Sequence, residues 1–312
     1  MNPNHSAYIH RETLLFSVYY APRGRGRLYK VAGEISQKHL LPTDSLIGVI
    51  GSEGSGKSTL IKGLFPGLEL TNDDDGVNVR SAPLFDFNPD DPFSGHTFHI
   101  DVNYELAFRQ PFEVAEAIKT ALEHKRRVIA EHFDQIYPFL QFNAEVMIGI
   151  GEEIIVARPT IFGPFPANIK SIVDKTVTYR LMAHSAEDIT SRILEKEYNY
   201  NRPVLHSDVR HGFVISFSEK PDIDISDLEG KVKKIIEADI PICPSGEDKI
   251  KIGNDEMSCT GIRTHVKSSG QIRNFRLRKE FMYDHLNKEW LLVGRVGGDE
   301  VVSFESLMAI AE

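Results

Sequence analysis

A glycine-rich stretch at residues 51–59 contains the residue types that bind phosphate groups. Glycines at its first, fourth and sixth positions let backbone N–H groups turn inward onto phosphate oxygens. The lysine after them can reach the β- and γ-phosphates of a nucleoside triphosphate, and the next serine hydroxyl can ligate Mg²⁺. The expected site for ATP and Mg²⁺, with Lys57 catalytic and Ser58 on the metal, comprises Gly51, Ser52, Glu53, Gly54, Ser55, Gly56, Lys57, Ser58 and Thr59.

The flanking residues predict the elements that would position this stretch. Residues 46–50 are a short apolar run with β-branched side chains, which suits a buried parallel strand. Residues 58–64 can open a helix, whose N-terminus adds partial positive charge. The stretch also fits the G-x-x-x-x-G-K-[ST] pattern of P-loop NTPases at every fixed position. A chance glycine-rich turn is the alternative, and the matching flanks disfavour it.

Acidic residues further along the chain could complete such a site. Asp73 and Asp74 lie in an acidic run after the first strand–helix unit, where an aspartate can accept the proton of an attacking hydroxyl or hold Mg²⁺ through water. A solvated turn is the equal alternative. Glu131 and Asp134 follow an apolar run, at the place where a second Mg²⁺ contact is expected at the end of a strand.

Strands that alternate with helices predict an α/β fold with a parallel, doubly wound sheet. Residues 28–41 and 112–125 have helical spacing, residues 146–150 and 154–158 read as strands, and residues 83–99 read as a long loop. Proline and glycine then interrupt regular structure before a long helical region at residues 169–198. The expected domains are an N-terminal extension (1–45), a nucleotide-binding domain (46–172) and a second domain (173–312).

Composition limits the classes of protein that fit. The formal net charge is −9, which argues against nonspecific nucleic-acid binding by the whole surface. The only cysteines are Cys243 and Cys259, too few for a disulfide framework, which points to a reducing compartment. The sequence has neither a signal pattern nor an apolar run long enough to span a bilayer. We therefore expect a cytoplasmic protein without a membrane partner.

The first half resembles the uridine-kinase-type branch of P-loop proteins. The resemblance rests on the stretch at residues 51–59, the acidic turn near residue 73 and the Glu-His-Phe-Asp-Gln-Ile-Tyr-Pro sequence at residues 131–138. It implies a phosphotransferase that moves the γ-phosphoryl group of ATP to a small hydroxylated acceptor. Neither the acceptor nor a preference for ATP over GTP is set by the sequence.

The second half contains three stretches in consistent order, at residues 179–188, 211–217 and 259–272. Together they resemble the second additional domain of alanyl- and threonyl-tRNA synthetases over roughly residues 178–280. The resemblance implies an α+β domain that deacylates mischarged tRNA at a zinc centre, with His184, Cys259 and His265 among the ligands. The chain departs from that family at Asp188, which replaces a histidine, and in the longer spacing between Cys259 and His265.

These residues leave open whether zinc binds. His184 and Asp188 are four residues apart and share a helix face, and carboxylate is an accepted zinc ligand. A degenerate centre without metal is the alternative, and His206 and His211 are alternative ligands or ordinary polar residues. The alternation of basic and apolar residues at 274–278 predicts a strand that buries one face and exposes arginines, which suits an RNA backbone or simply solvent.

Three functions follow. The first is an ATP- and Mg²⁺-dependent phosphotransferase. The second is a tRNA-associated protein, in which the second domain edits or binds aminoacyl-tRNA and the nucleotide-binding domain acts as a switch. The third is a nucleotide-responsive regulator without turnover.

Overall fold

The computed structural model describes residues 16–72, 80–91, 94–201, 204–206, 209–246 and 248–298. Within these ranges the chain forms two compact units. Unit 1 comprises residues 16–19 and 28–174, and unit 2 comprises residues 20–27 and 175–298. The acidic candidates Asp73 and Asp74 lie outside the described residues.

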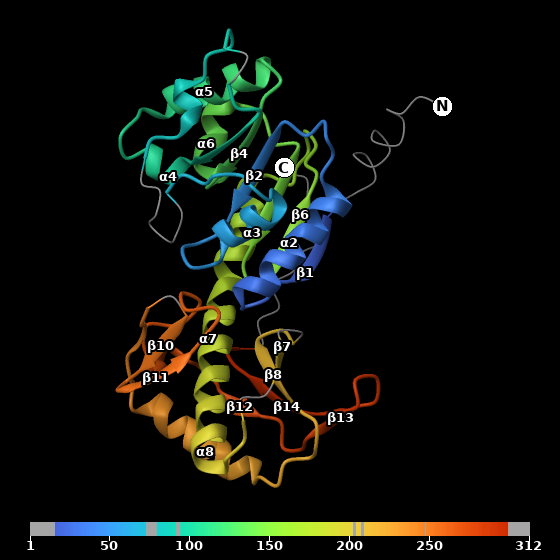
Figure 1. The fold of residues 1–312 in the computed structure, drawn as a ribbon, viewed down its shortest axis with the longest axis vertical. Helices are drawn as coiled ribbons and strands as arrows, with labels where there is room; N and C mark the ends of the chain where they lie inside the picture. Colours follow the sequence, from blue (N-terminus) through green and yellow to red (C-terminus); the bar gives the residue numbers. More distant parts are fainter. Residues whose placement is uncertain are drawn as a thin grey trace. The chain divides into compact units, whose positions relative to one another are not determined.

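Unit 1 is a mixed α/β structure built on a mostly parallel six-stranded sheet (Figure 1). The order is β1-β6-β5-β2-β4-β3. Strand β2 runs parallel to both of its neighbours, β4 and β5, and β3 runs parallel to β4. The strand bounds are β1 (Phe16–Tyr20), β2 (Leu46–Ile50), β3 (Thr97–Asp101), β4 (Arg127–Glu131), β5 (Val146–Ile150) and β6 (Glu153–Ala157).

The expectation of a wholly parallel sheet is wrong at β6, which pairs antiparallel with β5. Only residues 151 and 152 separate the two strands. A connection this short can join only antiparallel strands, because a parallel pair needs a crossover of a dozen or more residues. The Gly151 N–H donates to the Glu153 carbonyl across the turn, at 2.9 Å.

Helices of unit 1 follow the predicted apolar spacing. The predicted helices at 28–41 and 112–125 are confirmed as α2 and α5, and α5 begins with proline after a capping box formed by Gln110 and Glu113. At the sheet, Gly48 meets the ring of Phe133, where a Cβ atom would lie 2.6 Å from the ring. The helical bounds are α2 (Arg25–His39), α3 (Lys57–Leu64), η1 (Pro83–Asp86), α4 (Val102–Glu105), α5 (Pro111–Glu123) and α6 (Phe133–Leu140).

The predicted loop at residues 83–99 is wrong at both ends, where η1 and the start of β3 lie. The sequence pattern does not indicate strand β3, because His99 and Asp101 interrupt its apolar residues. Both polar side chains have partners in the fold, His99 with Thr71 and Asp101 with the N–H of Tyr104. These tertiary hydrogen bonds let two polar residues lie in a strand that the local apolar pattern does not indicate.

The long predicted helix is confirmed as α7 (Pro166–Tyr198), which begins in unit 1 and continues in unit 2. Unit 2 places α7 and α8 (Ile225–Glu237) with antiparallel sheets. One sheet has the order β12-β14-β8-β7, with β13 paired to β14, and the other has the order β11-β10-β9. Their strands are β7 (Val204–His206), β8 (Gly212–Phe217), β9 (Ile242–Pro244), β10 (Lys249–Ile252), β11 (Asp255–Ser258), β12 (Arg276–Leu277), β13 (Met282–Asp284) and β14 (Glu289–Arg295).

Unit 2 has its own apolar core, which includes Ala183 and Ile189 of α7 and Phe213 of β8. The predicted alternation near β12 is confirmed, since Phe275 and Leu277 are buried and the arginines beside them are exposed. Among the described residues, none of the helices is long and apolar enough to cross a membrane.

Candidate functional site: a glycine-rich loop and a four-residue metal-type cluster

The glycine-rich loop connects the end of β2 to the start of α3. Gly54 and Gly56 have φ angles of 73° and 93°, in the left-handed region that favours glycine. Gly51 is close to its surroundings, because a Cβ atom there would lie 2.8 Å from the Ser55 hydroxyl. The first N–H groups of α3 have no partner within the helix, so they face the loop that precedes it. The predicted order of strand, glycine loop and helix is present.

The Lys57 ammonium is buried beneath this loop. Its side chain is 3% exposed, and its Nζ lies 3.0 Å from the Ser52 carbonyl oxygen and 3.5 Å from Oε1 of Glu131. Ser58 is also buried, whereas Glu53 is exposed and Thr59 is half-buried. The structure thus brings Lys57 to Glu131, a pair that the sequence could nominate only as separate residues.

Glu131 ends β4 and also contacts His99 of β3, with 3.3 Å between Oε2 and Nε2. The Thr71 N–H donates to Nδ1 of His99, so a neutral imidazole carries its proton on Nε2 and donates to Glu131. Burial alone would raise the pKa of Glu131, but the His99 hydrogen bond and the Lys57 charge outweigh it and lower that pKa. Glu131 is therefore a buried, ionised carboxylate.

Asp101 is a second carboxylate at this place, which the sequence alone does not indicate. It ends β3 and pairs in register with Glu131 of β4. Burial, followed by the negative charge of Glu131, raises the pKa of Asp101 to about 6. The sequence feature that points to Asp101 is that both β3 and β4 end in an acidic residue. Recognising it required the knowledge that β3 and β4 are parallel neighbours.

The other charged residues near the loop form a separate group. Asp134, a candidate for the second Mg²⁺ contact, lies in α6 and pairs with Lys170 at 3.4 Å. Lys170 also pairs with Asp174, whose carboxylate accepts a hydrogen bond of 2.7 Å from the Ser52 hydroxyl. The first turns of α7 thereby contact the glycine-rich loop through Asp174.

Parallel strands explain why these groups converge. Strands β2, β3 and β4 end at one edge of the sheet, here called the carboxyl edge. The glycine-rich loop follows β2, Asp101 ends β3 and Glu131 ends β4. From β2 the chain passes first to β3 and β4 on one side and later to β5 on the other. Open α/β sheets bind ligands outside the carboxyl ends of their strands, at such a point of reversal.

Unit 2 brings together the four residues nominated as metal ligands. One ligand-type atom from each of His184, Asp188, Cys259 and His265 lies within 4.8 Å of the others. The Cys259 Sγ is 3.6 Å from Nε2 of His184 and 3.9 Å from Nε2 of His265. Oδ2 of Asp188 is 3.8 Å and 3.0 Å from the same two nitrogens. Ligands around tetrahedral zinc lie about 3.3–3.8 Å apart, given bonds of about 2.0–2.3 Å.

The surroundings orient these side chains toward one point. Nδ1 of His184 donates to the Thr264 carbonyl at 2.9 Å, and Nδ1 of His265 donates to the Ile262 carbonyl at 3.3 Å. Each histidine therefore presents Nε2 to the cluster, as metal-bound histidines do when the other nitrogen is hydrogen-bonded. Burial, followed by the charge of His265, holds the pKa of His184 well below its ordinary value, so its ring is neutral.

The longer spacing between Cys259 and His265 forms a compact turn. The Thr264 N–H donates to the Gly261 carbonyl at 2.9 Å, and the Gly261 N–H donates to Sγ of Cys259 at 3.3 Å. A Cβ atom on Gly261 would lie 2.4 Å from the Arg23 carbonyl oxygen and 2.8 Å from the His184 ring. The extra residues thus supply the carbonyl that orients His184 and do not move His265 away.

Of the alternative ligands, His211 lies against Tyr179, with the ring planes tilted by 46°, and is not part of the cluster. The side chain of His206 lies outside the described residues.

A scan against protein-family models finds no family that matches this chain. A search of curated proteins likewise finds no match.

Proposed function

We propose that unit 1 binds a nucleoside triphosphate with Mg²⁺ at residues 51–59 and transfers its γ-phosphoryl group to a small hydroxylated acceptor. The observation that supports this most directly is the buried ammonium of Lys57, placed between the glycine-rich loop and Glu131 at the carboxyl edge. A buried cation beside a glycine-rich loop at a helix N-terminus suits a polyphosphate.

The residues present fit this chemistry. The loop amides and Lys57 bind the phosphate oxygens and oppose the charge that develops during transfer. Ser58 and Glu131 are the groups that would hold Mg²⁺, which supplies further charge neutralisation. His99 keeps Glu131 ionised and oriented. In this proposal Asp101 accepts the proton of the acceptor hydroxyl, because it is the carboxylate here with a raised pKa.

Replacement of Lys57 by alanine tests the phosphate site. Removal of one group that stabilises transition-state charge commonly lowers kcat by about 10²–10³-fold, so we expect at least such a loss in Lys57→Ala. ADP release from ATP and Mg²⁺ is measured with a panel of nucleosides and other small alcohols. Lys30→Ala, an exposed lysine of α2, is the matched control and should behave as wild type. Unchanged turnover in Lys57→Ala would refute the proposal, and nucleotide binding without turnover would favour a regulator.

Asp101 gives the second prediction. Its carboxylate form predominates above pH 6, so the rate of transfer should rise from about pH 5 and level off above about pH 7. Asp101→Asn keeps the acceptor for the Tyr104 N–H but removes the proton acceptor, and should lower kcat by about 10²–10⁴-fold. The exposed Asp86→Asn is the control. A flat pH profile, or full activity in Asp101→Asn, would exclude Asp101 as the base.

For unit 2 we propose that His184, Asp188, Cys259 and His265 bind Zn²⁺. The supporting observation is the convergence of four buried ligand atoms at near-tetrahedral separations. A centre that uses four protein ligands is closed, which is typical of structural zinc, whereas catalytic zinc keeps a position open for water. The expected role is to fasten the turn at residues 259–265 to α7.

Paired cysteine substitutions test this centre. We expect about one equivalent of zinc in the wild type and in Cys243→Ser, whose cysteine is free and exposed. Cys259→Ser should lose most of the zinc and lower the unfolding temperature, because metal bound only in the folded state stabilises it. Zinc is measured by elemental analysis and unfolding by circular dichroism. Equal zinc content in the two variants would contradict the assignment.

Handling of aminoacyl-tRNA by unit 2 is the second candidate function. The same four-residue cluster and the exposed Arg276 and Arg278 favour it. Hydrolysis at a closed centre would require one ligand to leave the metal, so we expect tRNA binding without deacylation. A gel-shift assay at low salt, with a deacylation assay on mischarged tRNA, checks this. Deacylation that disappears in Cys259→Ser would instead assign the hydrolytic function, and absence of tRNA binding would remove this candidate.

A further inference from the structure

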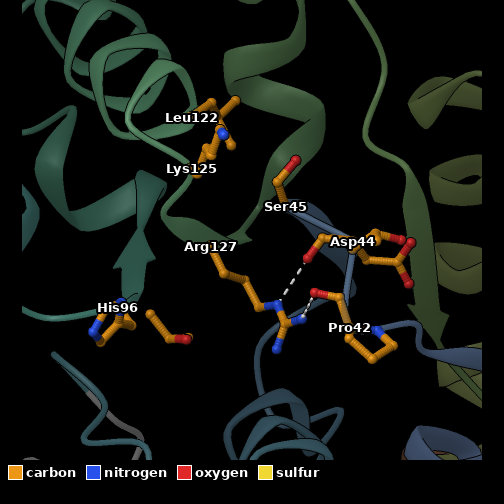
Figure 2. A pocket seen from close by; sticks show the side chains of 9 residues that line it. Pro42, Asp44, Ser45, His96, Leu122, Lys125 and Arg127 are labelled. Carbon is orange, nitrogen blue, oxygen red and sulfur yellow. Dashed lines mark hydrogen bonds between the residues drawn. The ribbon is translucent and has the colours of Figure 1, made fainter.

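A cavity of about 480 Å³ lies at the opposite edge of the unit 1 sheet from the glycine-rich loop (Figure 2). This edge, here called the amino edge, is where β2, β3 and β4 begin. The cavity is lined by Pro42, Thr43, Asp44, Ser45, His96, Thr97, Leu122, Lys125 and Arg127. Neither proposed site uses these residues.

Arg127 contributes a positive charge to the cavity lining, and the backbone carbonyl oxygens that it hydrogen-bonds do not neutralise this charge. Its Nε donates to the Asp44 carbonyl at 2.7 Å, and its Nη2 donates to the carbonyls of Pro42 and Leu41 at 3.0 Å and 3.3 Å. Figure 2 shows two of these bonds running from Arg127 to the loop that contains Pro42 and Asp44. Among the described residues, no carboxylate forms an ion pair with Arg127.

Lys125 and His96, which also line the cavity, supply two further donors. The ammonium of Lys125 forms no ion pair or hydrogen bond in the part of the chain that the structure describes. Nδ1 of His96 accepts a hydrogen bond of 2.7 Å from Arg126, so a neutral His96 carries its proton on Nε2. The hydroxyls of Thr43 and Thr97 add donors to the lining.

Two acidic residues at this edge, Asp44 and Glu145, both have partners. Asp44 is the one acid among the nine lining residues, and both of its carboxylate oxygens accept from Arg158, at 2.9 Å and 2.7 Å. This pair is buried. Glu145, beside Ser45, accepts from the Ser45 N–H and hydroxyl and from the Leu46 N–H. Asp44 and Arg158 neutralise one another, and the charges of Arg127 and Lys125 together exceed that of Glu145, so the net charge at the cavity is positive.

We infer that this cavity is a second anion site, which binds a small molecule carrying a phosphate group. A guanidinium, an ammonium and hydroxyl donors match the oxygens of a phosphate. The volume is within the range of small-molecule pockets and leaves room for an organic part against Leu122 and Pro42. The site does not depend on nucleotide binding at residues 51–59.

The test separates the two phosphate sites by using the Lys57→Ala protein, in which the glycine-rich loop has lost its lysine. Inorganic phosphate and phenyl phosphate are titrated into the full chain by calorimetry. We expect binding to persist in Lys57→Ala and to weaken by about tenfold or more when Lys125→Gln is added, because a charge-assisted contact is lost. Lys119→Gln, on α5 but outside the cavity lining, is the control and should leave the affinity unchanged.

Amide chemical shifts of the wild type give an independent readout. Phosphate should move the resonances of Ser45, Thr97 and Arg127. Shifts confined to residues 51–59, equal affinity in Lys125→Gln, or no binding by Lys57→Ala would each overturn the inference.

Discussion

The buried ammonium of Lys57 is the constraint on which the arrangement of unit 1 depends. A charged group taken out of water is costly unless a partner of opposite charge and hydrogen bonds compensate it. Here the compensation comes from the Ser52 carbonyl and from Glu131. Glu131 must stay ionised to compensate the charge of Lys57. Two successive hydrogen bonds, from Thr71 to His99 and from His99 to Glu131, help to keep it ionised. The sheet has to hold β2, β3 and β4 in fixed register for these groups to meet.

The two edges of that sheet present different chemistry. At the carboxyl edge, a lysine lies with two carboxylates, and the charges of Glu131 and Lys57 act on one another and on Asp101. At the amino edge, cations line a cavity whose one acid is paired with a buried arginine. The first arrangement suits an anion that arrives with its own metal cation, and the second suits an anion alone. Both follow from which strand ends carry charge.

In unit 2, several polar residues are buried next to the apolar core. Asp188 is fully buried, and the rings of His184 and His265 stack with their centroids 4.2 Å apart. A carboxylate, a cysteine and two imidazoles are ligand types that bind a divalent cation, and here they lie in one cluster. The hydrogen bonds on the outer nitrogens of both rings already fix their orientation, so the ligand atoms converge before any metal is considered.

The sequence by itself determined the features that depend on neighbours along the chain. The glycine loop, α2, α5 and α7 follow from spacing over a few residues, and His184 and Asp188 share a helix face for the same reason. Only the tertiary structure decided the rest. Strand register places Asp101 beside Glu131, and the turn after Cys259 brings His265 back to α7. Arg127 contacts the loop before β2, which lies more than eighty residues earlier in the sequence. Asp101 and Arg127 meet their partners through strand pairing and loop packing, which give no fixed spacing in sequence, so no local pattern could reveal those contacts.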